Sequence, residues 1–139
     1  GLEAPLLLTA AFLRATSGWA ATRRVLNISS GLGRRAMAGQ ASYCAAKAGM
    51  DHLTRALALD EARRPNGAKV VSLAPGVIDT DMQVQLRAGD AAGFPERANF
   101  IGLKEKGQLT SPDDAAARLI AYLNRADFGA NPVADVREA

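Results

Sequence analysis

The sequence predicts an α/β protein whose strands run parallel in one sheet. Residues 24–29 and 69–73 are short apolar runs with β-branched residues, as expected of buried strands. A long helical pattern over residues 42–63 separates them, so the three segments would form a right-handed βαβ unit. With 139 residues, of which 48% are hydrophobic, the chain is long enough to bury a core, and we expect a single domain over residues 1–139.

The chain opens with a predicted helix over residues 2–16. Leu6 and Leu13 recur at helical spacing, and further apolar side chains widen the surface that they form. A helix with so few polar positions is expected to be covered on two sides, by the sheet and by another subunit. Glu3 and the lack of a basic residue before the apolar run are the opposite of a secretory signal, and the run is too short to span a bilayer.

A glycine-rich turn follows the first strand and leads into the longest predicted helix. Ser30 places a hydroxyl group at the carboxyl end of the strand, the edge at which parallel α/β sheets bind ligands. Ser42 is expected to cap the helix over residues 42–63, and a Pro-Asn-Gly sequence ends it. Polar residues such as Asp51 interrupt the apolar stripe of this helix.

The remaining segments complete the alternation of strands and helices. Residues 81–106 are polar and broken by glycines, and a loop of this length is usually functional. Ser111 is expected to cap a helix that starts at Pro112 and carries acidic residues in its first turn. Residues 132–136 predict a final short strand, placed near the sheet edge because it contains a proline.

The composition excludes several classes of function. The net charge is only +3 and the arginines are dispersed in pairs, whereas a nucleic-acid-binding face needs a basic stripe with interleaved aromatic residues, which make up 5% of the chain. We expect no nucleic-acid partner and no membrane partner. The single cysteine, Cys44, allows neither an intramolecular disulfide nor a cysteine-based zinc site. We therefore expect no metal and a reducing, cytoplasmic location.

Tyr43 and Lys47 carry the clearest chemical signal. They lie four residues apart, so their side chains project from one face of the helix. A phenol has a pKa near ~10, and a neighbouring ammonium lowers such a pKa by roughly 1–3 units. The positive end of the helix dipole acts in the same direction. Together with the Ser30 hydroxyl, this arrangement is suited to proton delivery to a carbonyl oxygen during hydride transfer.

These residues give the chain a resemblance to the short-chain dehydrogenase/reductase family. Ser30, Tyr43 and Lys47 are followed by Pro-Gly-Val-Ile-Asp-Thr at residues 75–80, and this ordered set is similar to the family signature. The amino-acid sequence around this set is most similar to that of the sepiapterin reductase and benzil reductase branch. The resemblance implies a Rossmann-like doubly wound parallel sheet and a small-molecule carbonyl substrate. It also implies NADP as cofactor, with NAD as the alternative.

The resemblance assigns roles to individual residues. Ser30, Tyr43 and Lys47 would be catalytic, and residues 81–106 would form the substrate lid. The cofactor-binding residues that it implies are Tyr43, Lys47, Pro75, Gly76, Ile78 (through its backbone) and Thr80 (through its hydroxyl group).

The family pattern also starts before this chain does. The resemblance covers only the carboxyl-terminal half of such an enzyme, so the amino-terminal half of the fold, with its pyrophosphate-binding loop, is absent from the chain. We therefore expect a fragment of a longer enzyme that does not bind the dinucleotide tightly by itself. Its first strand would then expose an unpaired apolar edge.

Other interpretations remain open or weaker. The chain could be a non-catalytic truncated scaffold that acts through oligomer or partner contacts, and a homo-oligomer through the helices around residues 2–16 and 42–63 is expected. A serine hydrolase is disfavoured because the sequence has no G-x-S-x-G elbow. Residues 31–36 fit G-x-G-x-x-A, but we discount a dinucleotide loop because the helix is expected only from Ser42. The arginines at 34 and 35 either favour an anionic group on the substrate or are solvated.

Overall fold

The structure, a computed structural model, describes residues 1–76 and 110–138. No helix within these two ranges combines the length and hydrophobicity needed to cross a membrane. The elements follow in the order α1 (Glu3–Ala15), β1 (Arg24–Ile28), η1 (Gly31–Gly33), α2 (Ala41–Ala62), β2 (Lys69–Ala74), α5 (Pro112–Leu123), β3 (Val133–Asp135) and η2 (Val136–Glu138), where η marks a 3-10 helix.

The strands of the described ranges form a parallel sheet in the order β1-β2-β3. Ile28 of β1 pairs with Leu73 of β2, and Leu73 in turn pairs with Ala134 of β3. α2 connects β1 to β2 and packs on β2, as the βαβ prediction requires. β1 lies at one edge of this sheet, and Ile28 is 43% exposed there, as expected of an apolar edge.

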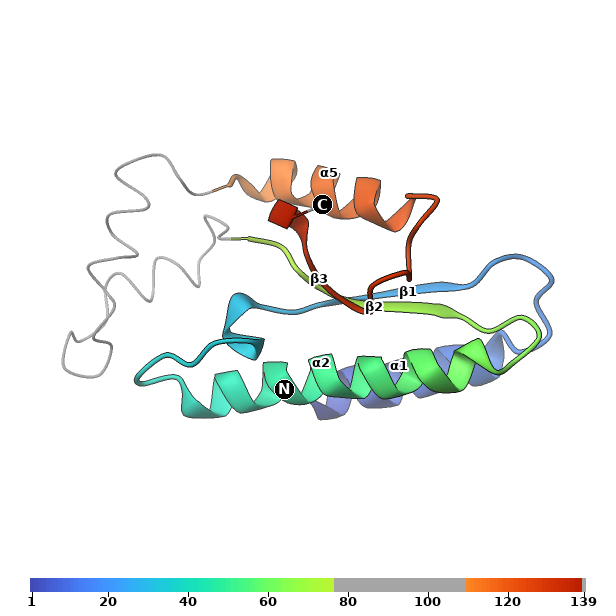
Figure 1. Ribbon diagram of the computed structural model, residues 1–139, viewed down its shortest axis with the longest axis horizontal. Helices are drawn as coiled ribbons and strands as arrows, with labels where there is room; N and C mark the ends of the chain where they lie inside the picture. Colours follow the sequence, from blue (N-terminus) through green and yellow to red (C-terminus); the bar gives the residue numbers. More distant parts are fainter. Residues whose placement is uncertain (77–109, 139) are drawn as a thin grey trace.

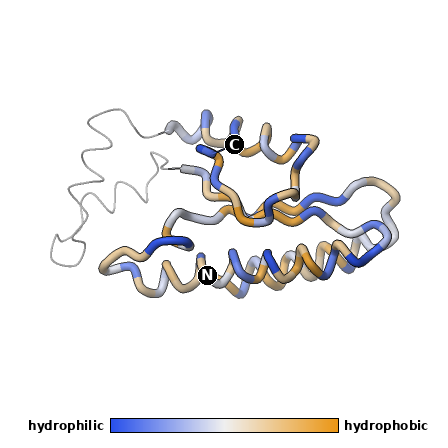
Figure 2. Tube along the Cα trace, in the orientation of Figure 1, coloured by the Kyte–Doolittle hydropathy of each residue, from blue (hydrophilic) through white to orange (hydrophobic). Residues whose placement is uncertain are grey.

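Helices cover both faces of the sheet (Figure 1). α1 and α2 run side by side on one face, and α5 lies on the other. Hydrophobic residues concentrate in the central strands, whereas the helices alternate hydrophobic and hydrophilic positions (Figure 2). Because side chains of a strand point alternately to opposite faces, each residue of β2 belongs to one of two interiors.

The interior between the sheet and α5 is apolar. Val71 and Leu73 are fully buried and cluster with Phe128, and Leu119 and Leu123 of α5 pack against them. Each fully buried aliphatic side chain of this kind stabilises the fold by about 1.5–3 kcal/mol. The opposite interior, between the sheet and α2, contains Ser72 and is polar near the carboxyl ends of the strands.

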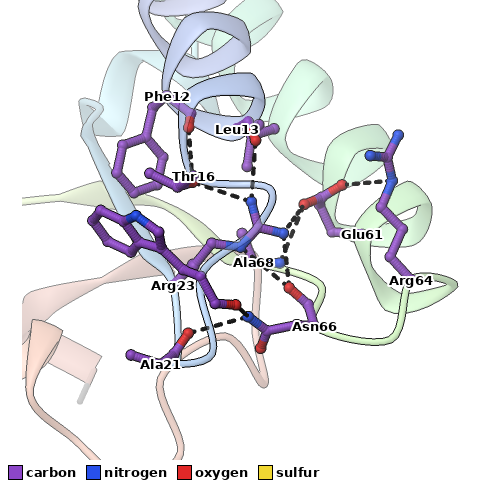
Figure 3. Close-up of polar contacts among 10 residues, drawn as sticks. Phe12, Leu13, Thr16, Ala21, Arg23, Glu61, Arg64, Asn66 and Ala68 are labelled. Carbon is purple, nitrogen blue, oxygen red and sulfur yellow. Dashed lines mark hydrogen bonds and ion pairs between the residues drawn. The ribbon is translucent and has the colours of Figure 1, made fainter.

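At the amino-terminal end of β1, a buried arginine links the surrounding helices to the strand (Figure 3). Arg23, just before β1, is 4% exposed and donates to the carbonyl oxygen of Leu13 and the hydroxyl group of Thr16 at the end of α1. It also donates to Glu61 of α2 at 3.4 Å and to the carbonyl oxygen of Asn66 at 2.7 Å. These contacts join α1, α2 and the start of β1 away from the carboxyl edge of the sheet.

The predicted elements are present with small shifts at their ends. Ser111 caps α5 as predicted, since its Oγ accepts a hydrogen bond from the amide of Asp114 at 3.1 Å. The prediction of Ser42 as the cap of α2 was wrong: the helix begins at Ala41, and its N-cap residue, Gln40, makes no side-chain capping bond. Ser42 therefore lies inside the first turn of the helix and not at its N-cap.

The apolar surface of α1 is covered by the rest of the described chain on one side only. Leu6, Leu7 and Leu8 are 42%, 58% and 71% exposed, respectively. The sheet and α2 thus cover only part of the leucine-rich surface of α1. The sequence predicts that this surface is covered on two sides.

Candidate active site

The candidate site lies at the carboxyl edge of the sheet, where β1 and β2 end together. The amide of Ser29 donates to the carbonyl oxygen of Leu73 at 2.8 Å, so the pairing of the two strands continues past Ile28. Ser30 follows immediately and leaves the sheet. Its Oγ accepts a hydrogen bond from the amide of Leu32 at 3.2 Å and thereby caps η1. The chain after β2 turns away at the same edge.

Tyr43 and Lys47 reach this edge from the first turns of α2. The Nζ of Lys47 lies 5.6 Å from the centroid of the Tyr43 ring, which places the ammonium over the aromatic face. The same Nζ donates a hydrogen bond to the carbonyl oxygen of Ile28 at 2.9 Å. Because Ile28 is two residues before Ser30, the ammonium is fixed beside the strand end that carries the serine.

Two opposing effects act on Lys47. Burial lowers its pKa from the ordinary lysine value because the ammonium loses water, and the negative charge of Asp51 raises that pKa again. Tyr43 is half-buried and makes no hydrogen bond to Ser30 or Lys47 within the described ranges. The structure therefore brings the lysine to the phenol ring and to the strand end, while the serine hydroxyl is engaged with its own turn.

The turn after β2 contains two of the predicted cofactor-binding residues. Pro75 is buried, and Gly76 has a positive φ of 81°, a conformation that favours glycine. A Cβ atom at Gly76 would also contact the side chain of Arg137 at 3.6 Å. The other two, Ile78 and Thr80, lie outside the described residues, as does the predicted lid over residues 81–106.

Sequence reasoning gave no role to Asp51, which is 1% exposed on α2. Its Oδ1 accepts hydrogen bonds from the hydroxyl groups of Ser29 at 2.7 Å and Ser72 at 2.6 Å. The position of Asp51, four residues after Lys47 on the same helix face, was the available signal.

Arg34 has a partner within the fold that the sequence did not indicate. Its Nε lies 3.1 Å from Oδ2 of Asp51, so the partly exposed guanidinium forms an ion pair with that carboxylate. A hollow of about 370 Å³ adjoins the site, and its charged lining residues are Arg34, Arg35, Arg55, Asp135, Arg137 and Glu138.

The glycine motif at residues 31–36, the single cysteine and the acidic residues add no further candidate site among the described residues. No α-helix begins within residues 31–36, because only the short η1 lies there and α2 starts at Ala41. Cys44 is half-buried next to Tyr43. Residues 1–76 and 110–138 contain no group of three or more histidine, cysteine or acidic side chains placed to hold a metal ion.

Comparison with known proteins identifies the family. The family model for short chain dehydrogenase matches residues 2–91. The chain is 38% identical over 137 residues to a benzil reductase ((S)-benzoin forming) of Bacillus cereus, covering 99% of this chain and 55% of the relative. It is 34% identical over 129 residues to the sepiapterin reductase of Rattus norvegicus, covering 91% of this chain and 47% of the relative.

The solved structures agree. A short-chain dehydrogenase/reductase from Saccharomyces cerevisiae superposes with a TM-score of 0.66 at 26% identity, over 81% of this chain and 45% of that one. The fold and the matched segment define an α/β protein of the Rossmann-like kind, as predicted. The chain belongs to the short-chain dehydrogenase family. It spans about half the length of the curated relatives that it matches.

Proposed function

We propose that this chain carries the reaction site of an NADP(H)-dependent oxidoreductase that reduces a small carbonyl compound or oxidises the corresponding alcohol. The observation that carries the proposal is the position of the Lys47 ammonium, which lies over the Tyr43 ring and is bound to the end of β1. A charge held at this place acts on the phenol and on anything bound at the carboxyl edge of the sheet.

Each residue has a separate role in the proposed reaction. Ser30 polarises and orients the carbonyl group by donating its hydroxyl hydrogen, which stays free because Oγ only accepts from the Leu32 amide. Tyr43 gives its phenolic proton to the carbonyl oxygen, or takes a proton from the alcohol in the reverse direction. The ammonium of Lys47, which lies over the Tyr43 ring, stabilises the negative charge that develops on the phenolic oxygen as the proton moves.

The described residues fit the nicotinamide end of the cofactor. An ammonium has three N–H donors, and Lys47 uses one of them on Ile28, so two are left for ribose hydroxyl groups. Tyr43 would share the ribose, while Pro75 and Gly76, with Ile78 and Thr80 beyond them, would hold the carboxamide. When bound, the cofactor would supply the hydride. We propose NADP, with NAD as the alternative.

The names of the relatives suggest the class of substrate. The Bacillus cereus relative is a benzil reductase, and the rat relative is a sepiapterin reductase. We propose a small carbonyl compound as the substrate of this protein too, with a cytoplasmic location, neither nucleic acid nor membrane as partner, and residues 1–139 forming part of one domain.

The test is turnover of the protein expressed from its complete reading frame, with benzil as the probe substrate and NADPH as the reductant. Tyr43→Phe should lower kcat by about 10²–10⁴-fold while leaving the Kd for NADPH nearly unchanged. Tyr122→Phe is the matched control, because Tyr122 belongs to α5, packs on Phe128 and should keep full turnover. Retention of turnover by Tyr43→Phe would refute the proposed role.

A second candidate is a non-catalytic scaffold that works through self-association. The exposed leucines of α1 favour it, since Leu7 and Leu8 leave apolar surface uncovered by the described residues. The helix that carries them runs beside α2 (Figure 1). Association through α1 and α2 is compatible with both candidates, and a monomer at all concentrations in sedimentation would contradict it. Titration of the 139-residue chain with NADPH separates the two: saturable binding at micromolar concentration favours the enzyme, and a stable dimer without binding favours the scaffold.

A further inference from the structure

The carboxylate of Asp51 joins three separate parts of the chain beneath the candidate site. Ser29 at the end of β1 and Ser72 in β2 both donate to its Oδ1. Arg34, from the segment after η1, pairs with its Oδ2 at 3.1 Å and also donates to the carbonyl oxygen of Ser72 at 3.3 Å. Asp51 itself lies on α2, one turn beyond Lys47 and two turns beyond Tyr43.

Burying a charge at this point has a free-energy cost that needs compensation. A carboxylate removed from water is tolerated only when it is paired and hydrogen-bonded. Here the two serine hydroxyls satisfy Oδ1, whereas Oδ2 receives no hydrogen bond from the described residues and has only the ion pair with Arg34. That guanidinium is 26% exposed, so solvent screens part of its charge. The negative charge is therefore not fully neutralised.

The uncompensated charge acts on Lys47. Two charged groups interact with Asp51: Arg34 from the segment after η1, through an ion pair, and Lys47, one turn earlier on α2. Arg55, one turn later on α2, lines the same hollow as Arg34, while β1 and β2 contribute neutral serines. On the β3 side, Asp135 is itself within the electrostatic influence of Arg34. Among these groups, Asp51 is the carboxylate whose charge opposes the loss of the proton from Lys47.

We propose that Asp51 is a positioning residue of the Ser30, Tyr43 and Lys47 site: it clamps the ends of β1 and β2 under the site and its charge stabilises the Lys47 ammonium. The second part rests on the proposed function, because the charge of Lys47 matters only if it acts on Tyr43. Both parts follow from one buried side chain, but different properties of that side chain serve them. The clamp needs an acceptor oxygen, and the lysine needs a negative charge.

Asp51→Asn separates these two properties, because asparagine keeps an acceptor oxygen for both serines and removes the charge. We expect the pKa of Lys47, followed by NMR of its side chain in the protein expressed from its complete reading frame, to fall by about one unit. Glu61→Gln is the matched control: Glu61 is an equally buried carboxylate of α2 paired with Arg23 and Arg64 at the other end of the helix. It should leave the Lys47 titration unchanged.

A second variant keeps the test decisive if Asp51→Asn does not fold. Arg34→Gln removes the partly exposed positive charge that competes for Asp51, so it should raise the pKa of Lys47. Unchanged Lys47 titration in folded Asp51→Asn, or in Arg34→Gln where only that variant folds, would overturn the proposal.

The pH profile of turnover supplies a readout that a purely structural role would not move. In the reducing direction, the alkaline limb of kcat should shift to lower pH in Asp51→Asn and stay in place in Glu61→Gln, because the ammonium is lost earlier. Failure of the proposed function looks different. In that case the Lys47 pKa still moves with Asp51, while turnover does not depend on Tyr43.

Discussion

Lys47 of α2 is hydrogen-bonded to the main-chain oxygen of Ile28 in β1, at 2.9 Å. A side chain from the helix thus binds the strand two residues before Ser30, at the edge where parallel sheets bind ligands. The bond fixes the ammonium beside the Tyr43 ring, and no carboxylate in residues 1–76 or 110–138 forms an ion pair with it. Lys47 therefore helps to hold α2 against β1, and it also supplies positive charge to the site.

Replacing Lys47 by methionine should separate these two contributions. Lys47→Met loses one hydrogen bond, but it also removes the cost of burying an ammonium, so the free energy of unfolding should change by less than about 1 kcal/mol. Turnover in the complete protein should fall by about 10²-fold or more, because the phenol loses its neighbouring charge. Urea unfolding and NADPH consumption measure the two effects. A variant that unfolds easily, or one that keeps its turnover, would contradict this division.

The serines that bind Asp51 should matter for stability although they are not at the reaction centre. Ser72→Ala and Ser29→Ala each remove a hydrogen bond to a buried carboxylate, which typically contributes about 1.5–3 kcal/mol. Ser42→Ala is the control, since its exposed side chain caps nothing and should change the free energy of unfolding by less than about 0.5 kcal/mol.

The double variant of Ser29 and Ser72 gives a further check on the shared acceptor. Both hydroxyls donate to the same oxygen, so their losses should not add. A double-mutant cycle in urea measures the coupling. Strict additivity would show that the two serines act independently of each other.

Much of this architecture can be predicted from the sequence because its signals are local. The strands appear as apolar β-branched runs, and the Ser-Pro-Asp-Asp sequence at residues 111–114 contains both the cap of α5 and its acidic first turn. The start of α2 is harder, because the chain enters the helix at Ala41 without any side-chain cap, and Ser42 offers a misleading local signal.

Asp51 shows why part of the site cannot be predicted this way. A carboxylate in the middle of a helix usually marks a solvated position. Its burial here depends on two serines from different strands and on an arginine beyond η1, and only the tertiary fold brings these groups together. Tyr43 and Lys47 were accessible to sequence reasoning because their spacing, together with Ser30, forms a recognisable ordered set, whereas Asp51 on the same helix face belongs to no such set.

Stability at acidic pH should depend on the ion pair between Asp135 and Arg137. Arg137 binds the carboxylate of Asp135 through two side-chain nitrogens, at 2.9 and 2.6 Å, and holds the pKa of Asp135 below its ordinary value of 3.8. Between the lowered pKa and 3.8 the unfolded chain binds more protons than the folded one. The stabilisation is therefore present above 3.8 and is lost as the pH falls through the lowered pKa.

Arg137→Gln should remove this dependence. The guanidinium is 58% exposed, so solvent screening limits the loss near neutral pH to less than about 1 kcal/mol, and the difference from the parent protein should vanish once the pH is below the lowered pKa of Asp135. Urea unfolding at several pH values measures it. Arg125→Gln is the control, because its partner Asp127 is at the surface and the pair should have no measurable effect. A difference that persists in acid would contradict the assignment.

Position 33 requires glycine because its backbone packs closely against the candidate site. A Cβ atom on Gly33 would overlap Oδ2 of Asp51 and lie 3.2 Å from the main-chain carbon of Lys47. Gly33→Ala should therefore displace Asp51 from Arg34 and push η1 away from α2, at a cost of about 1–3 kcal/mol. Turnover should also fall, because Lys47 moves with the helix.

Gly31→Ala is the matched control, since Gly31 belongs to the same 3-10 helix and a Cβ there meets nothing within 4 Å. That control should stay within about 0.5 kcal/mol of the parent protein. Equal stability and turnover of the two alanine variants would show that α2 tolerates the shift and that the site does not depend on the close approach of η1.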